Sequence, residues 1–164
     1  MTHSQLNLLK EAPKTYRYII DTSSILSQKP NEPNRRIVNK SLWEYIDSLI
    51  NEQIIVTCSE ILEEIKDDDL AEWWRNLGGE IMSVDEDIQN NVVHVVTQQP
   101  DIIDFKQVKS SGDAFLIATA MKYNLIIITE ESKASPKKIP KVAEMLGIES
   151  LNIIELCEKE DKQF

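Results

Sequence analysis

The sequence predicts one α/β domain in which a mostly parallel sheet of about four to five strands is flanked by helices on both faces. Two observations predict it: short apolar, β-branched segments recur along the chain, and segments with helical periodicity separate them. Strands that crossover helices bury on both faces form continuous apolar runs of this kind. The 164 residues are 41% hydrophobic and show no repeat or linker, so one core suffices without a disulfide or metal.

The first half of the chain alternates between short strands and helices. Residues 16–20 are β-branched and aromatic and stop at a polar turn, as a buried strand does. Pro30 and Pro33 exclude a helix interior from the following loop, and Ser59 is a suitable helix N-cap. In order, we expect a lead-in (1–15), a strand (16–20), a turn (21–24), a loop (28–34), a helix (36–51), a strand (54–57), a helix from Ser59 and a helix over 70–77 closed by Gly78 and Gly79.

The second half repeats the pattern. Ile88, Val92 and Val95 give one segment an apolar helical face, and 125–128 is the clearest strand in the chain. In order, we expect a helix (86–98), a loop or short helix (100–111), a helix (113–123), a strand (125–128), a lysine-containing loop (132–140), a helix (140–146) closed by Gly147 and a last strand (152–154). These elements define a domain over 16–158 with a tail over 159–164.

The chain is acidic, with 18 basic and 28 acidic residues and a formal net charge of −10. This argues against a protein that coats nucleic acid through a broad basic surface, but it is compatible with an enzyme that holds cations with carboxylates. Cys58, Cys157, His3 and His94 lack metal-binding spacing, so we expect free thiols and no zinc site, as in a cytoplasmic protein. No apolar run suits a signal peptide or a membrane span.

Acidic residues follow the strands, at the edge where open parallel sheets gather their chemistry. They are Asp21 after the first strand, Glu60, Glu63 and Glu64 after the second, Asp113 at the start of the helix before the third, and Glu130 and Glu131 after the third. Converging carboxylates repel one another unless a divalent cation or bound protons neutralise them. Oxygen ligands without thiolate or imidazole suit Mg²⁺ or Mn²⁺, which assist phosphoryl chemistry.

Each of these acids also has an ordinary structural interpretation. Asp113 complements a helix dipole, and Asp21 can open a turn with the serines that follow it. The glutamates over 60–64 suit a solvated helix face, and Glu130 and Glu131 suit a loop. Only their joint placement favours a functional site, and that placement depends on the predicted topology.

Four motifs in this order resemble those of the PIN-domain ribonucleases, which include the VapC-type toxins of toxin–antitoxin pairs. They are Ile-Asp-Thr-Ser-Ser at Asp21, Ser-x-x-x-x-Glu-Ile over 59–65, Gly-Asp-x-x-x-Ile-Ala-x-Ala at Asp113, and an apolar strand followed by Thr129, Glu130 and Glu131. The likeness spans roughly residues 16–157. Trp73, Trp74 and the Lys-Ile-Pro-x-Val run over 138–142 are similar to a less characterised prokaryotic PIN-like branch.

The resemblance implies a Mg²⁺- or Mn²⁺-dependent endoribonuclease, the toxin half of a type II toxin–antitoxin pair. Asp21, Glu64, Asp113 and Glu131 would then be the metal-binding and catalytic carboxylates. The fourth position is commonly Asp in the family, whereas this chain has Glu131 with Glu130 beside it. This departure leaves open an alternative in which the chain is a catalytically inactive PIN-like interaction module.

Further residues are candidates for contacts with substrate or partners. Ser23 and Thr129 lie within the motifs, and Arg36 and Lys133 lie in two basic loops that are candidates to hold phosphates. Of the adjacent pair at 73–74, one tryptophan is expected in the core and the other on a partner or base-stacking surface. The resemblance implies an RNA substrate and an antitoxin partner, and no membrane is expected. Whether the protein forms a homodimer stays open.

Overall fold

The structure is a computed structural model that describes residues 15–98 and 111–164. The predicted loop or short helix over 100–111 and the lead-in lie almost wholly outside these residues. The five strands form one sheet in the order β3-β2-β1-β4-β5, and every neighbouring pair is parallel. They are β1 (Tyr18–Ile20), β2 (Ile55–Cys58), β3 (Ile81–Met82), β4 (Ile126–Ile128) and β5 (Ser150–Leu151). The predicted α/β fold class is therefore confirmed.

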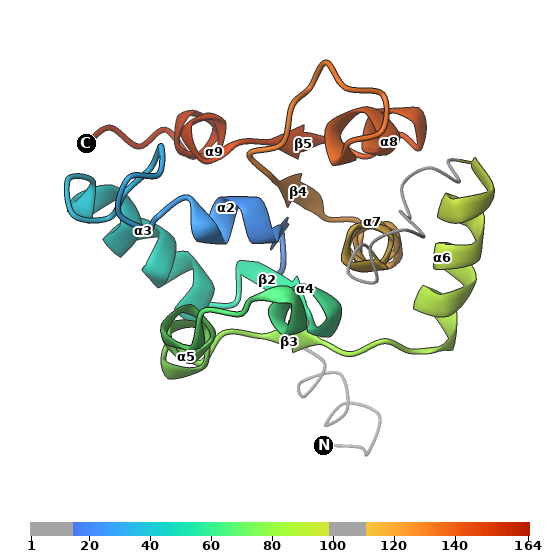
Figure 1. The fold of residues 1–164 in the computed structure, drawn as a ribbon, viewed down its shortest axis with the longest axis horizontal. Coiled ribbons are helices and arrows are strands. Elements are labelled where there is room, and N and C mark those ends of the chain that lie inside the picture. Colours follow the sequence, from blue (N-terminus) through green and yellow to red (C-terminus); the bar gives the residue numbers. More distant parts are fainter. Residues whose placement is uncertain (1–14, 99–110) are drawn as a thin grey trace, which may run out of the picture.

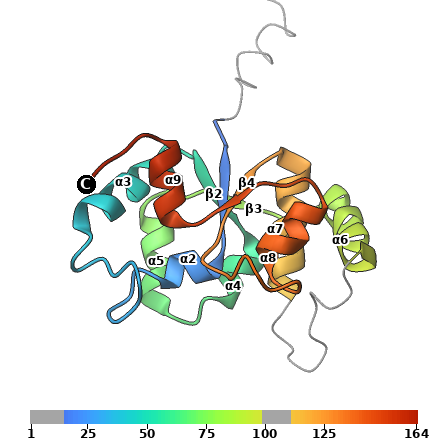
Figure 2. The same cartoon turned by 90° about the horizontal axis from the view of Figure 1, so that it is seen from above.

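Helices cover both faces of this sheet (Figure 1). The helices α3, α5 and α9 lie on one side, and α7 and α8 lie on the other with α6 outside α7. Their bounds, with those of α2 and α4, are α2 (Thr22–Leu26), α3 (Lys40–Asn51), α4 (Ser59–Glu64), α5 (Asp68–Asn76), α6 (Glu86–Gln98), α7 (Ser111–Tyr123), α8 (Ile139–Met145) and α9 (Ile153–Lys159). Figure 2 shows β1 running directly into α2, so the chain enters a helix at the carboxyl edge of the sheet.

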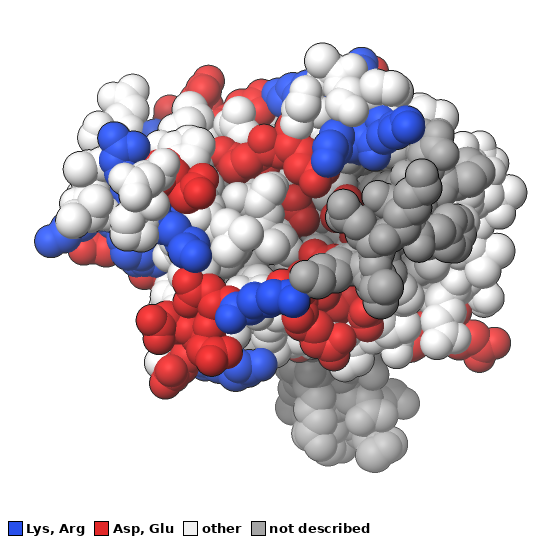
Figure 3. All heavy atoms as spheres, in the orientation of Figure 1, with Lys and Arg blue, Asp and Glu red and all other residues white. Residues whose placement is uncertain are grey.

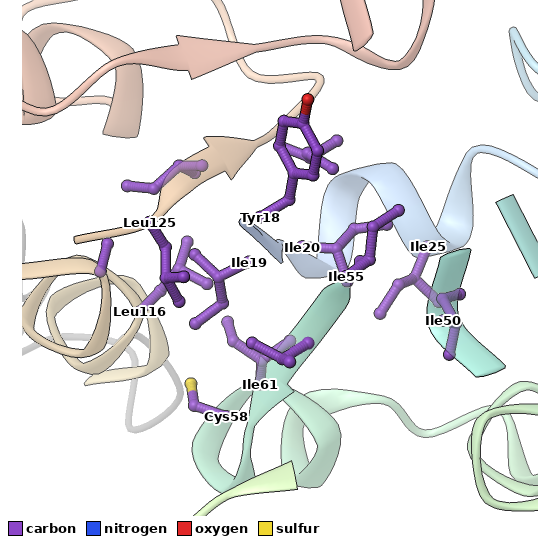
Figure 4. Close-up of a cluster of buried hydrophobic side chains, with 14 of the residues drawn as sticks. Tyr18, Ile19, Ile20, Ile25, Ile50, Ile55, Cys58, Ile61, Leu116 and Leu125 are labelled. Atoms are coloured by element: carbon purple, nitrogen blue, oxygen red, sulfur yellow. The ribbon is translucent and has the colours of Figure 1, made fainter. Parts of the chain in front are cut away.

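The core is centred on β1, whose three residues are all buried. Ile19 points toward Leu116 of α7, whereas Ile20 points to the opposite face, toward Ile55 (Figure 4). Successive side chains of a strand alternate between faces, so a central strand with apolar residues on both sides must be covered by two helical layers. This burial fixes the sheet, and the sheet in turn positions the residues that follow each strand.

One predicted strand is wrong. Residues 152–154, expected as the last strand, form the start of α9, and β5 lies two residues earlier. Asn152 is the N-cap: its side chain accepts a hydrogen bond from the Glu155 backbone N–H at 2.8 Å, and its own N–H donates to Glu155 Oε1 at 3.0 Å. This capping box favours a helix over the extended conformation that Ile153 and Ile154 suggested.

Other differences concern element boundaries and very short elements. The predicted turn at 21–24 is the helix α2, and the helix expected from residue 36 begins at Lys40. The two-residue strand β3 was not predicted, because two residues carry no readable periodicity. The predicted helices after Ser59, over 70–77, 86–98, 113–123 and 140–146 correspond to α4, α5, α6, α7 and α8.

The last residues of the chain pack back onto the domain. The Glu160 carboxylate accepts hydrogen bonds from the Tyr18 hydroxyl and from Arg17, and the Phe164 ring lies 5.9 Å from that of Tyr45 between centroids. Within the described part of the chain, no helix has the length and apolar character that crossing a membrane requires.

Candidate active site

The parallel strands bring their carboxyl ends to one edge of the sheet, and Asp21 lies at the centre of that edge. It follows β1, and its backbone N–H donates to the carbonyl of Ile128 at the end of β4, 2.8 Å away. Asp21 is 2% exposed. Its Oδ2 accepts hydrogen bonds from Ser23 Oγ at 2.7 Å and from Thr129 Oγ1 at 2.9 Å. Two hydroxyls from different elements therefore hold the carboxylate in place.

The environment of Asp21 opposes its ionisation. Burial raises its pKa to about 6, the negative charge of Glu131 adds to the rise, and the hydrogen bonds from Ser23 and Thr129 partly offset it. An acid with this pKa is ionised at neutral pH but retains a proton in mildly acidic solution.

Glu64, the last residue of α4, faces Asp21 from the neighbouring element. Thr22 Oγ1 donates to Glu64 Oε2 at 3.1 Å, and the backbone N–H of Gly112 also donates to this carboxylate. The carboxylate lies so close to Gly112 that a Cβ on that residue would be 2.0 Å from Glu64 Oε1. Burial, followed by the charges of Asp21 and Glu60, raises the pKa of Glu64 above its usual value.

Asp113 completes this side of the site from the first turn of α7. Burial raises its pKa to about 8, and the charges of Asp21, Glu131 and Glu64 add to the rise in that order. Lys138 acts in the opposite direction. In the absence of a cation, Asp113 is therefore mostly protonated at neutral pH.

The adjacent acids Glu130 and Glu131 face different surroundings. Glu131 raises the pKa of both Asp21 and Asp113, and its Oε2 accepts a hydrogen bond from the N–H of Ile139 at 3.1 Å. Glu130 points away from this cluster. It accepts hydrogen bonds from Asn34 Nδ2 at 2.8 Å, Ser24 Oγ at 3.1 Å and the Ile153 N–H at 3.1 Å.

Four of the predicted acids thus lie close enough for their charges to affect one another, and each comes from a different element. They are Asp21 after β1, Glu64 in α4, Asp113 in α7 and Glu131 after β4. Figure 3 shows acidic side chains gathered near the middle of one face, with lysine and arginine beside them. Among the residues the structure describes, no three His, Cys, Asp or Glu side chains form a ready-made metal site.

Two of the predicted substrate contacts are engaged elsewhere. Arg36 donates from both terminal nitrogens to the Asp47 carboxylate at 2.8 Å, and its guanidinium lies over the rings of Trp43 and Trp73. Lys133 makes an ion pair with Glu155. Both cations are thus paired with protein carboxylates, whereas Ser23 and Thr129 donate hydrogen bonds to Asp21 in the acid cluster.

The core position expected for one of the two adjacent tryptophans is confirmed, and so are the free thiols. Trp74 is fully buried, whereas Trp73 is only partly buried and donates its indole N–H to Asp47 at 3.0 Å. His94 is exposed on α6, and both cysteines are buried free thiols. The sequence reasoning missed the positions of Thr22 and Gly112 beside Glu64, although both lie within the quoted motifs.

Solved structures with a similar fold include PIN-like proteins. The crystal structure of FitAcB from Neisseria gonorrhoeae has a TM-score of 0.52 at 17% identity, with 84% of this chain and 98% of that chain covered. A structure of FitAB bound to an IR36 DNA fragment has a TM-score of 0.51 at 18% identity, with 83% and 94% covered. PAE2754 from Pyrobaculum aerophilum has a TM-score of 0.50 at 11% identity, with 91% and 92% covered.

These likenesses define the class of fold: the domain has a PIN-like fold. The chain belongs to the family described as a domain of unknown function, DUF4411, which matches residues 18–164. No curated protein matches the sequence.

Proposed function

We propose that this protein is a metal-dependent endoribonuclease that hydrolyses RNA phosphodiester bonds. The observation that carries the proposal is the convergence of Asp21, Glu64, Asp113 and Glu131 from four elements at the carboxyl edge of a PIN-like sheet. A cluster of this kind has no evident benefit for stability, because uncompensated carboxylates repel one another and resist burial.

The donor set fits Mg²⁺ or Mn²⁺. It consists of carboxylate oxygens, the ligands these ions prefer, and Asp21, Glu64, Asp113 and Glu131 would hold the ion. Burial raises the pKa of Asp21 and Asp113, and the like charges of neighbouring carboxylates add to the rise, so a bound cation would favour the ionised form of both. When bound, the ion supplies positive charge at the attacked phosphate and makes a water molecule more acidic.

The surrounding residues keep the carboxylates in position for this role. Ser23 and Thr129 fix Asp21, Thr22 and the Gly112 N–H fix Glu64, and the Ile139 N–H fixes Glu131. Asp113 has its pKa raised to about 8, further than that of Asp21. In our proposal, Asp113 releases its proton as the divalent cation binds.

The biological setting we propose is the cytoplasm, as the toxin component of a type II toxin–antitoxin pair whose antitoxin blocks the site. This part rests on the sequence resemblance to VapC-type toxins and on the PIN-like fold of the solved neighbours. We expect expression of the protein to be toxic to the cell. Co-expression of a neighbouring gene should suppress this toxicity, and Asp113→Asn should remove it. A neighbour that neither binds the protein nor suppresses toxicity contradicts the pairing.

Cleavage of labelled RNA tests the activity itself. The wild-type protein should cleave a mixed-sequence RNA in Mn²⁺, whereas Asp113→Asn and Glu64→Gln should not. Glu63→Gln is the matched control, because Glu63 is exposed on the same helix as Glu64. Equal activity in all four proteins contradicts the mechanism, and preferential cleavage of DNA contradicts the substrate.

A second candidate is an inactive PIN-like interaction module. The observation that favours it is that no three potential ligands of the described residues form a ready-made metal site. Calorimetry separates the two candidates. If the protein is the proposed enzyme, the wild type should bind Mn²⁺ at millimolar concentrations, and the Asp21→Asn/Asp113→Asn double variant should not. Identical titrations of the two proteins favour the module.

A further inference from the structure

We propose that Lys138 contacts the substrate, by donating a hydrogen bond from its ammonium group to a non-bridging oxygen of the phosphate at the acid cluster. This inference rests on the proposed function and adds a residue to it. It also gives the Lys-Ile-Pro-x-Val run over 138–142 a role, because that run forms the start of α8 beside the cluster.

The position of Lys138 follows from the contacts of its neighbours. The next residue, Ile139, donates its N–H to Glu131 Oε2 at 3.1 Å, which joins the start of α8 to the cluster. Ile139, Pro140 and Val142 are buried, so this end of the helix is anchored in the core. Lys138 is exposed at the N-cap, in an extended conformation. A rigid backbone thus presents a flexible cation at the rim of the site.

Lys138 is also a basic residue whose charge acts on Asp113 and lowers its pKa. It makes no ion pair within residues 15–98 and 111–164, unlike the other basic residues considered. Lys133 pairs with Glu155, Lys141 with Glu144, and Arg36 with Asp47. A cation that is close to the cluster and not paired with a carboxylate of the described residues can bind an incoming anion.

The charge of the site makes such a cation useful. The chain carries a formal net charge of −10, and the substrate is itself a polyanion. A lysine ammonium is a compact charge with three donors on a flexible stem, which suits a phosphate whose position varies along the RNA. Because Lys138 and a divalent cation carry charge of the same sign, Lys138 should weaken ion binding slightly while it strengthens substrate binding.

The test therefore measures two quantities that should change in opposite directions. Lys138→Ala should lower kcat/KM for RNA at saturating Mn²⁺ by about tenfold or more, as expected for a lost hydrogen bond to a charged group. The same variant should bind Mn²⁺ about two- to fivefold more tightly in calorimetry, because a repelling charge has been removed. Lys138→Arg should recover most of the cleavage, since it restores the charge.

Lys141→Ala is the matched control: it removes a lysine from the same helix whose charge is already paired with Glu144. It should leave both quantities unchanged. Undiminished kcat/KM in Lys138→Ala overturns the role of Lys138 while leaving the proposed function intact. A parallel loss of cleavage and Mn²⁺ affinity also overturns it, because it indicates damage to the cluster. If the wild-type protein cleaves no RNA, both the proposed function and the proposed contact of Lys138 with the substrate are overturned.

Discussion

The Glu64 carboxylate lies against the backbone of Gly112, where a Cβ would approach Glu64 Oε1 to 2.0 Å. Because Gly112 has no side chain, the Glu64 carboxylate of α4 can reach the first turn of α7 and accept a hydrogen bond from the Gly112 N–H. A side chain at residue 112 would have to displace this carboxylate from Thr22 and from the rest of the cluster.

Gly112→Ala should therefore weaken Mn²⁺ binding by about tenfold or more, the range typical of a misplaced ligand or its supporting group. Calorimetric titration with Mn²⁺ checks this. Gly147→Ala is the control, because Gly147 has φ +73° and open space around it. That variant should lose about 1 kcal/mol of stability, from the strained backbone, and bind Mn²⁺ normally. Unchanged affinity in Gly112→Ala would show that Glu64 is not a ligand.

The raised pKa of Asp113 makes stability depend on pH. Its folded-state pKa is about 8, against 3.8 for an ordinary aspartate, so between these values the folded chain binds a proton that the unfolded chain has lost. The free energy of unfolding must then fall as pH rises through this window, by at most about 1.4 kcal/mol per pH unit. Asp21, with a folded-state pKa of about 6, adds to the fall below pH 6.

Asp113→Asn should remove most of this dependence between pH 6 and 8, because the amide does not titrate. Urea unfolding of wild type and variant at pH 5, 6, 7 and 8, without divalent cations, measures it. The variant should be the more stable protein at pH 8. Parallel stability profiles would mean that Asp113 ionises freely in the folded state.

The acid cluster was predictable because each member is tied to a local signal. Asp21 ends an apolar run and Asp113 begins a helix, and a parallel sheet brings strand ends to one edge. The sequence could not distinguish the roles of Glu130 and Glu131, because these depend on residues distant in the chain. The Glu130 carboxylate accepts hydrogen bonds from the Asn34 side chain and the Ile153 N–H, whereas the Glu131 carboxylate accepts one from the Ile139 N–H.

Long-range contacts also decide what the basic residues are paired with in the fold. Arg36 and Lys133 are predicted phosphate ligands because they lie in loops near strand ends, and this prediction takes no account of their ion pairs with Asp47 and Glu155. Their partners, Asp47 and Glu155, lie on helices whose orientation only the folded structure gives. The prediction of a last strand over 152–154 was wrong for a different reason. Asn152 and Glu155 form a capping box that can be read from the sequence, and this signal outweighs the apolar pair between them.

The two adjacent glutamates give a matched pair of variants. Glu130→Gln should cost about 1 to 3 kcal/mol, because each of its oxygens accepts a hydrogen bond and an amide nitrogen must then face a donor. Glu131→Gln should leave stability unchanged or improve it, since it removes a charge that opposes Asp21 and Asp113, but should abolish cleavage. Urea midpoints and RNA cleavage of both variants check this. Loss of activity in Glu130→Gln alone would make Glu130 the fourth catalytic acid.

The contact between Arg36 and Asp47 should matter for stability and little for catalysis. The pair is bidentate, with the Arg36 and Asp47 side chains 32% and 22% exposed. The guanidinium also lies 5.3 Å from the Trp43 ring centroid and 5.6 Å from that of Trp73. Arg36→Lys keeps the charge but loses the planar fork and the stacking, so it should destabilise the protein by about 1 kcal/mol.

Asp47→Asn should destabilise the protein by a similar amount, and the double variant should lose less stability than the sum of the two single variants, because both changes remove the same interaction. Urea unfolding followed by tryptophan fluorescence reports this directly, since two of the three tryptophans contact Arg36. A large fall in RNA cleavage by Arg36→Lys, with stability unchanged, would instead make Arg36 a phosphate ligand.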